Sequence, residues 1–272
     1  MVKVKKNIKV SIITVVRNGL PYLDDCINSF QLQDYNNKEL IVVFSKSNDS
    51  TLKYLKEKKI KFFKENKFGI YRAINKGLKK AAGDLVGILH SDDIFFDTKV
   101  ISDVVKKYKS EKFDICYGNV CISKKNNLKE ILRKWQSSKF DYKKFYYGWM
   151  PPHTSVFINR NLIKKKYSIK YKISSDYKYI LDNFKKNSKE IFFFNRFITI
   201  MRSGGLSNLN FKSYILKSNE DFLILKEKFL YPRLISFLKI FIKISQFIFI
   251  KIKFNTKDKI YKEIINKKIY NF

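Results

Sequence analysis

Cysteine is scarce in this 272-residue sequence, which contains three, and no two of them form a C-x-x-C pair. An odd number without paired spacing excludes a disulfide framework, so we expect Cys26, Cys116 and Cys121 to be buried thiols in a reducing cytosol. The first six residues also lack the apolar segment of a secretory signal, and we expect no such signal.

Acidic residues are few as well: 24 Asp and Glu face 57 Lys and Arg, which gives a formal net charge of +33. A charge this large attracts polyanions such as nucleic acid, anionic lipid headgroups or phosphorylated ligands. The lysines occur in every segment instead of one stripe or arm, and no nucleic-acid-binding motif is present. We therefore expect a membrane surface and a diphosphate ligand as partners, and no nucleic acid.

No Pro- or Ser-rich linker and no internal repeat divides the chain, and 45% of its residues are hydrophobic. Such a chain can bury a large core, which excludes disorder. The length suits one full α/β domain followed by a C-terminal helical extension. We expect the domain to cover residues 1–210 and the extension residues 211–272.

Apolar runs alternate with helical periodicity along the first half of the chain. Strands are expected at 8–16, 40–44, 60–63 and 85–89, and helices at 21–33, 49–56, 69–82 and 98–108. This alternation predicts a doubly wound, mostly parallel sheet of the Rossmann-like type. Ligands of such sheets lie beyond the carboxyl ends of the strands, so the loops after Val16, Phe44 and Leu89 are candidate sites. Further strands at 113–122, 154–158 and 191–201 and a helix at 174–184 are expected to complete the domain.

Residues 230–254 are dense in Ile, Phe and Leu but are interrupted by lysines. On a helical wheel the polar residues of this segment gather on one side: Ser236, Lys239, Lys243, Gln246 and Lys253. A helix in the plane of a membrane surface would keep the ammonium groups at the headgroups and bury Phe237, Phe241, Ile244 and Ile248. Two alternatives stay open. The helix packs on the domain or on a second subunit, or it spans the membrane, at roughly 3 kcal/mol for each lysine in hydrocarbon.

Ser91, Asp92 and Asp93 follow directly on a buried strand, at the edge of the sheet where ligands bind. Two adjacent carboxylates there suit a hard divalent cation that is shared with substrate phosphates. The alternative is that these residues only cap the helix that follows.

Six segments, in order along the chain, resemble family 2 glycosyltransferases, which have the GT-A fold. Residues 11–19 resemble the first strand and loop of that family, and residues 69–77 the helix that it places against the donor nucleotide. Residues 82–93 look like its donor-and-metal strand. Residues 150–157 and 174–177 look like its acceptor-side segments, and residues 204–207 like its closing loop.

The resemblance implies inverting transfer from a nucleotide sugar, with UDP-sugars favoured and Mn²⁺ or Mg²⁺ as cofactor. Asp93 would bind the metal, with Asp92 sharing it or contacting the donor ribose. Asp176 would be the general base that deprotonates the acceptor hydroxyl, and His153 lies on the acceptor side. The resemblance places the donor contacts at Thr14, Val16, Asn18, Asp49, Gly69, Asn75, Ser91 and Asp92.

Two of these assignments have plain structural alternatives. Asp176 lies at the start of a predicted helix, where an acid in the first turn stabilises the helix dipole. His153 follows two prolines and precedes an apolar run, so the alternative is a buried structural histidine.

Three residues depart from the family pattern. Phe44 stands where the family has an aspartate that reads the nucleotide base, and a phenylalanine can stack but accepts no hydrogen bond. Lys67 and Arg72 stand where the family often has acids, and both alternatively belong to the solvated basic face. These departures indicate either altered donor specificity or lost activity.

The leading hypothesis is a bacterial glycosyltransferase, peripheral on the cytoplasmic, inner face of the cell membrane, that builds a surface polysaccharide or lipid-linked glycan. Its partners would be a nucleotide sugar, a glycan or lipid-linked acceptor and an anionic membrane surface, with oligomerisation left open. A catalytically silent family member that binds a glycan or a partner, and a basic nucleic-acid binder, are the alternatives.

Overall fold

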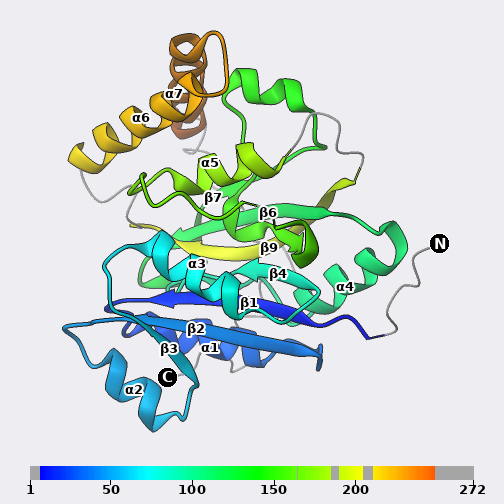
Figure 1. Ribbon diagram of the computed structural model, residues 1–272, viewed down its shortest axis with the longest axis vertical. Coiled ribbons are helices and arrows are strands. Elements are labelled where there is room, and N and C mark those ends of the chain that lie inside the picture. Colours follow the sequence, from blue (N-terminus) through cyan, green and yellow to red (C-terminus); the bar gives the residue numbers. More distant parts are fainter. Residues whose placement is uncertain (1–6, 164, 185–189, 205–210, 249–272) are drawn as a thin grey trace.

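The computed structural model describes residues 7–163, 165–184, 190–204 and 211–248, which place helices on both faces of one sheet (Figure 1). Within these residues nine strands pair in the order β3-β2-β1-β4-β8-β6-β9-β5, and β7 pairs with β6 off this path. The strands are β1 (Val10–Val16), β2 (Lys38–Ser45), β3 (Phe62–Glu65), β4 (Leu85–Ile88), β5 (Ile94–Phe95), β6 (Ile115–Lys124), β7 (Asn127–Trp135), β8 (Phe157–Asn159) and β9 (Ile191–Arg202). The α-helices are α1 (Tyr22–Gln31), α2 (Thr51–Glu57), α3 (Ile70–Lys80), α4 (Val100–Glu111), α5 (Ser175–Asn183), α6 (Phe211–Lys226) and α7 (Pro232–Ile248). Short 3₁₀ helices are η1 (Tyr142–Tyr147), η2 (His153–Ser155) and η3 (Arg160–Leu162).

The predicted α/β fold class is confirmed. Strands β3, β2, β1 and β4 pair in parallel, with α1, α2 and α3 as the connections between them. Beyond β4 the sheet becomes mixed, because β8 runs antiparallel to both β4 and β6, while β6 and β9 pair in parallel. Parallel pairing is therefore concentrated in the half of the chain that has the continuous β-branched runs.

The expected strand over residues 154–158 is only partly right. Thr154 and Ser155 lie in η2, and β8 begins at Phe157. The Ser155 hydroxyl donates to the Pro152 carbonyl at 2.7 Å, and its backbone N–H donates to the same oxygen at 3.0 Å. These bonds close a turn that an apolar pattern alone does not reveal. Strand β7 was not predicted, because its sequence is mostly polar and its side chains are half-buried or exposed.

Strand β1 is buried on both faces, which explains its unbroken apolar run. Ile13 and Val15 pack with α3 and α5 in one core cluster. Val10 and Ile12 pack with α1 and α4 in another. Alternate side chains of a strand point to opposite faces of the sheet, so helices cover both sides of β1.

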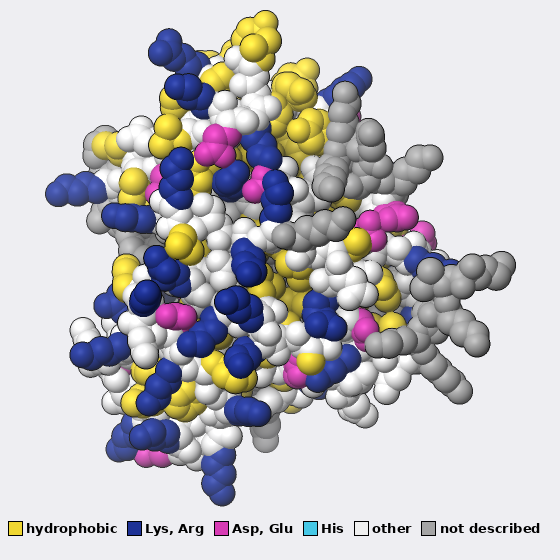
Figure 2. All heavy atoms as spheres, viewed as in Figure 1, with side chains coloured by type: hydrophobic (Ala, Val, Ile, Leu, Met, Phe, Trp, Pro, Cys, Tyr) yellow, Lys and Arg dark blue, Asp and Glu magenta, His cyan; other side chains and the backbone are white. Residues whose placement is uncertain are grey.

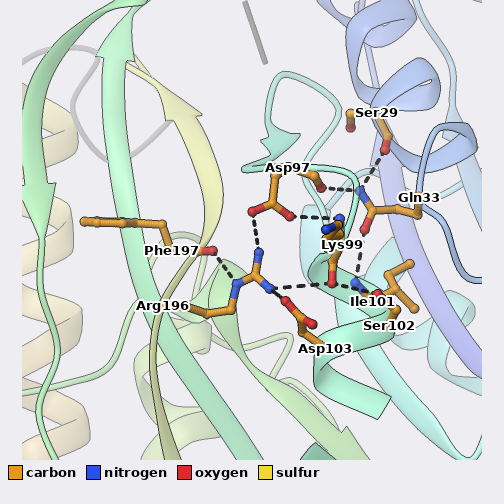
Figure 3. A network of polar contacts seen from close by, with 9 residues as sticks. All are labelled: Ser29, Gln33, Asp97, Lys99, Ile101, Ser102, Asp103, Arg196 and Phe197. Carbon is orange, nitrogen blue, oxygen red and sulfur yellow. Dashed lines mark hydrogen bonds and ion pairs between the residues drawn. The ribbon is translucent and has the colours of Figure 1, made fainter. Parts of the chain in front are cut away.

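A polar network braces the segment that leads into α4 (Figure 3). Arg196 of β9 forms ion pairs with Asp97 and Asp103, which lie on either side of the start of α4. Gln33, just after α1, donates to the Asp97 carbonyl at 2.6 Å and accepts from the Ile101 N–H at 3.0 Å. Strand β9 and helix α1 thus hold this segment from two sides.

Helices α6 and α7 form a pair beside α5, away from the parallel half of the sheet (Figure 1). Ile224 and Leu225 of α6 and Ile235 of α7 belong to the same core cluster as Tyr177 of α5. The described part of the C-terminal extension therefore shares the core of the domain. The division at residue 210 remains a prediction.

Helix α7 is oriented opposite to the interfacial arrangement that its lysines predicted. Lys239 points into the protein, where its Nζ lies 2.8 Å from Asp221 and 3.3 Å from the centre of the Tyr177 ring. Phe237 and Phe241 are 64% and 61% exposed. The prediction that Lys239 faces headgroups is wrong, because a buried carboxylate of α6 pairs with it. The side chains of Lys243, Ile244, Gln246 and Ile248, and all of Lys253, lie outside the described residues.

Exposed apolar side chains gather on α6 and α7. In Figure 2 they lie at the top of the molecule, where Figure 1 places these two helices. They are Ile215, Leu216, Leu223, Leu234, Phe237 and Phe241, with Leu230 and Tyr231 in the connection. Lysines and arginines cover much of the rest of this face (Figure 2). No helix in the described part of the chain has the length and apolar character needed to cross a membrane.

Candidate active site

The loops that follow β1 and β2 are tied together at the predicted ligand edge. Asn18 adopts a left-handed backbone with φ of 52°, and its N–H donates to the Ser47 hydroxyl at 2.9 Å. Its side-chain oxygen accepts the Asn48 N–H at 2.8 Å. Asp49 accepts N–H groups of Leu20 and Thr51. Partial burial acts to raise the pKa of Asp49, but these hydrogen bonds together lower it, so the Asp49 carboxylate is negatively charged.

The other residues of these two strand ends lie in the core. The Thr14 hydroxyl contacts the Cys26 sulfur at 3.8 Å, and both side chains are fully buried. Val16 packs in an apolar cluster with Phe44. Phe44 also meets Phe62 edge-on, with ring centroids 5.7 Å apart. The Phe44 side chain therefore belongs to the core. Donor contacts by Thr14 and Val16 stay predictions, and only the backbone groups of these two residues could make them.

The acid turn, defined as residues 90–93, is held by Arg202 at the end of β9. The Arg202 guanidinium donates to the Asp92 carbonyl at 2.7 Å and forms an ion pair with Asp25 of α1. Its backbone N–H donates to Asp93 Oδ1 at 3.2 Å. The Cys26 thiol donates to the His90 carbonyl at 3.2 Å. Ser91 and Asp92 remain half-buried, so the turn is fixed by its backbone while part of it still reaches solvent.

Asp93 is the buried acid of the pair. Burial raises the pKa of its carboxyl well above the usual range, and the neighbouring Asp92 charge adds to this. Its Oδ2 is buried without a hydrogen-bond partner in the described structure. A buried polar oxygen without a partner is costly, and a cation beside it would hold the carboxyl in its charged form.

The acid turn fits a divalent cation that takes most of its ligands from a substrate. The described residues contain no group of three or more His, Cys, Asp or Glu side chains that could enclose a metal ion. Mg²⁺ is usually bound by one or two carboxylates together with substrate phosphates. Asp93 Oδ2 and the half-buried Asp92 match that kind of site.

Helix α3 connects the predicted ligand edge to the segment that precedes α5. It starts after Gly69, whose φ of 139° favours glycine, because a side chain there would be strained. The Asn75 amide exchanges two hydrogen bonds with the backbone of Tyr167, at 2.8 and 2.9 Å. The Tyr71 hydroxyl donates to the Ile173 carbonyl. Asn75 thus serves the packing of α3 on this segment, and its contact with a donor stays a prediction.

Asp176 lies close to both histidines of the chain. Its negative charge acts on His90 and on His153, in each case against a larger effect of burial that lowers the histidine pKa. The two imidazole rings have centroids 6.0 Å apart. His90 belongs to the acid turn and Asp176 to the first turn of α5. The charge of Asp176 thus acts on the acid turn, although His90 and Asp176 lie 86 positions apart in the chain.

His153 is a half-buried histidine that is neutral at pH 7. Its Nε2 lies 2.5 Å from the Tyr167 hydroxyl, and Tyr167 stacks between Tyr71 and Tyr179, with centroid distances of 5.8 and 3.9 Å. Burial lowers the pKa of His153 to about 4. This environment accounts for a structural role, and a contact with an acceptor remains open beside it.

Two side chains that bind the backbone near the candidate site escaped prediction from the sequence. Arg202 is the last residue of a strand that was expected to end at Met201, and a single arginine at this position does not indicate a role in the site. Glu220 lies in α6, in a part of the chain that the resemblance does not cover. The expected closing loop includes residues 205–207, which lie outside the described residues.

A sequence model of Glycosyl transferase family 2 matches residues 11–171, more than half of the chain. The chain belongs to this family. The match contains the parallel strands, the acid turn and His153, and it ends before Asp176 and Arg202. The protein is therefore a glycosyltransferase, and the predicted family is confirmed.

One relative of this glycosyltransferase is an uncharacterized glycosyltransferase of Haemophilus influenzae. It is 30% identical over 222 residues, which cover 77% of this chain and 86% of the relative. Other relatives are longer: the chain spans only 20% of an uncharacterized glycosyltransferase from Rickettsia conorii, with 35% identity over 126 residues and 43% of this chain.

Solved structures share the fold of this glycosyltransferase. The complex of S. aureus TarS residues 1–349 with UDP-GlcNAc has a TM-score of 0.62 at 14% identity, covering 88% of this chain and 92% of that one. The mannosyltransferase PcManGT from Pyrobaculum calidifontis, in complex with GDP-Man and Mn²⁺, has a TM-score of 0.59 at 14% identity, covering 89% and 72%. At this identity the likeness shows the GT-A fold alone.

The environment of His153 generates a prediction about stability and pH. Its pKa is about 4 in the fold and roughly 6.5 when unfolded, so the unfolded chain binds the extra proton between these values. Stability from this residue is present at pH 7 and is lost as the pH falls toward 4. Between pH 7 and pH 5 the wild type should lose about 2 kcal/mol more unfolding free energy than His153→Gln, in urea titrations at both pH values. Equal losses in the two proteins would show that His153 is not buried in the neutral form.

Proposed function

We propose that this protein transfers a sugar, with inversion, from a nucleotide-diphosphate donor to a hydroxyl of a glycan acceptor. The observation that carries the proposal is that the ring of His90, in the acid turn, lies 6.0 Å from the ring of His153 between centroids, and that the charge of Asp176 acts on both histidines. A transferase of this kind needs an acceptor-activating base on one side of the sugar and a stabilised leaving diphosphate on the other. Asp176 and the pair Asp92 and Asp93 supply these two functions from different elements.

Each of the three acids has a defined task in the proposed reaction. Asp176 accepts the proton of the acceptor hydroxyl as its oxygen attacks the anomeric carbon. The bond from that carbon to the donor phosphate breaks through an oxocarbenium-like state, and the nucleoside diphosphate leaves on the opposite face. Asp93 and Asp92 would hold Mn²⁺ or Mg²⁺, which when bound neutralises charge on the departing diphosphate.

A nucleotide sugar is the donor class that the comparisons favour. The related folds were solved with UDP-GlcNAc and with GDP-Man and Mn²⁺. UDP-sugars remain our preferred donors. Phe44 is buried and cannot accept a hydrogen bond from a base, so Asn18 and Asp49, whose loops are joined at the strand ends, are the proposed nucleoside contacts.

The acceptor is proposed to be lipid-linked and to be met at the inner face of the cell membrane. Support comes from the outward apolar face of α7 and the connection before it, made by Leu230, Tyr231, Leu234, Phe237 and Phe241. Apolar patches of this kind mark interaction surfaces. The positive charge of the chain suits anionic headgroups around that face. The opposite side of α7 packs on α6 and on Tyr177 of α5, the helix that carries the proposed base.

The role of Asp176 is tested by Asp176→Asn. Transfer, or donor hydrolysis with water as acceptor, should fall by about a hundredfold or more, because an amide cannot take the proton. Binding of UDP-GlcNAc or GDP-Man with Mn²⁺, measured by thermal shift, should stay at the native level. Asp182→Asn, on the same helix, is the matched control. A native turnover rate in Asp176→Asn would show that Asp176 is not the base and only stabilises the start of α5.

The metal site is tested by Asp93→Asn. The wild type should be stabilised by a sugar nucleotide only in the presence of Mn²⁺, by about 2.7 kcal/mol at a hundred times its dissociation constant. The variant should lose the Mn²⁺-dependent stabilisation by the sugar nucleotide, since a hard cation loses a charged oxygen ligand. Thermal-shift titrations with and without Mn²⁺ measure both proteins. Equal Mn²⁺ dependence in the two proteins would exclude Asp93 as a ligand.

The membrane surface is tested by the triple variant Leu234→Ser, Phe237→Ser and Phe241→Ser, which changes only exposed side chains. Each such side chain contributes roughly 1.5 to 3 kcal/mol when fully buried, so vesicle binding should weaken at least about tenfold. Co-sedimentation with anionic phosphatidylserine vesicles at high salt measures the contribution of these apolar side chains to binding, because salt screens the charges of the lysines.

The control for the vesicle experiment changes two exposed apolar residues elsewhere, Leu32 and Phe68, to serine. The control protein should bind as the wild type does. If the triple variant also binds like the wild type, α7 is not the membrane-facing surface.

A further inference from the structure

A buried carboxylate from the C-terminal extension accepts hydrogen bonds from the backbone just before α5. Glu220 of α6 is 6% exposed. Its Oε1 accepts the Lys172 N–H at 2.7 Å, and its Oε2 accepts the N–H groups of Ile173 and Ser174, both at 2.9 Å. Three consecutive backbone donors thus converge on one side chain that lies about 46 positions further along the chain.

In the described structure no side-chain cap closes the N-terminus of α5, and Glu220 binds the backbone just before it. Ser174 is the residue before α5, and its side chain makes no capping bond to that helix. Its hydroxyl donates instead to the Lys217 carbonyl of α6, at 3.3 Å. Glu220 therefore adds a second negative charge just before the N-terminus of α5, beside that of Asp176 in its first turn, and α6 holds the backbone from which α5 starts.

Ion pairs fix the orientation of α6 about its axis, and this orientation directs Glu220 toward residues 172–174. The neighbouring Asp221 pairs with Lys217 at 3.2 Å and with Lys239 of α7 at 2.8 Å. Burial lowers the pKa of Lys239 to about 8, while the two lysines, against burial, lower the pKa of Asp221 to about 2. A side chain at Gly148, the residue after η1, would come within 2.6 Å of the Lys239 Cβ, so α7 is closely packed at this point.

The opposite side of the same segment is held by the donor-side helix. The Tyr71 hydroxyl of α3 donates to the Ile173 carbonyl, while Glu220 accepts the Ile173 N–H. Residue 173 is thus bound on both of its backbone groups, by α3 on one side and α6 on the other. Asp176 follows three residues later, in the first turn of α5.

We infer that Glu220 is a positioning residue for Asp176: it fixes the backbone from which the base reaches the acceptor. This inference rests on the proposed role of Asp176 as base. Small displacements matter in such a step, because a misplacement of about 1 Å can cost on the order of a hundredfold in rate. The described C-terminal helices are then part of the catalytic machinery.

The test is Glu220→Gln, which keeps the size of the side chain but exchanges one accepting oxygen for a donor group. The turnover of UDP-GlcNAc or GDP-Man by hydrolysis with Mn²⁺ should fall at least about tenfold and up to about a hundredfold. The KM for the donor should change less than twofold. Backbone hydrogen exchange of residues 171–178 should become faster, with the strands of the parallel half unchanged.

The matched control is Glu227→Gln. Glu227 lies just beyond the end of α6, accepts from the Tyr171 hydroxyl at 2.7 Å and pairs with Lys178, yet it makes no bond to the N–H groups of residues 172–174. Its turnover should stay within twofold of the native value. If Glu220→Gln proves too unstable to assay, Glu220→Asp keeps the charge but retracts it by one methylene. It should turn over more slowly than the wild type.

The outcomes separate the two proposals. Native turnover in Glu220→Gln, with Asp176→Asn inactive, overturns the positioning role and leaves the base intact. Native turnover in Asp176→Asn overturns the proposed function itself. Equal losses of turnover and donor binding in Glu220→Gln, or a loss as large in Glu227→Gln, would show a general structural effect and would also overturn the inference.

Discussion

The guanidinium of Arg202 is the interaction on which the candidate site depends. It is buried at the end of β9, where it binds the Asp92 carbonyl, pairs with Asp25 and donates to the Lys125 carbonyl at 3.0 Å. A buried cation without partners is costly, and removing one partner of a buried ion pair typically costs 3–5 kcal/mol. The guanidinium therefore fixes α1, the acid turn and the β6–β7 hairpin relative to one another. Arg196, in the middle of the same strand, fixes the start of α4 through Asp97 and Asp103.

Much of the parallel half was predictable, because its strands are buried on both faces and read as unbroken apolar runs. The acid turn was predictable for the same reason, since it follows the last of those strands. The second half was harder. Strand β7 is polar, η2 is closed by Ser155 hydrogen bonds, and the strand order after β4 depends on contacts that no local pattern encodes.

Single polar residues limit the prediction of the site in a different way. Arg202 and Glu220 belong to no recurring motif, and the side chain of each binds backbone groups distant in the sequence. Helix α7 shows a related limit. Its sequence separates lysines from aromatics, but a helical wheel does not state which side meets the protein. Asp221 decides that question, because it attracts Lys239 inward and leaves Phe237 and Phe241 exposed. The charge of a neighbouring helix thus sets the orientation of the apolar face.

The place of β9 in the sheet also determines when the site can form as the chain is made. Strand β9 lies between β6 and β5, and Arg202 joins Asp93 across 109 positions and Asp25 across 177. N-terminal segments leave the ribosome first, and contacts of such long separation close late. The parallel strands can therefore pair on a nascent chain that already carries both acids. Asp92 and Asp93 still lack their arginine at that stage, so the acid turn takes its final shape only after residue 202 has emerged.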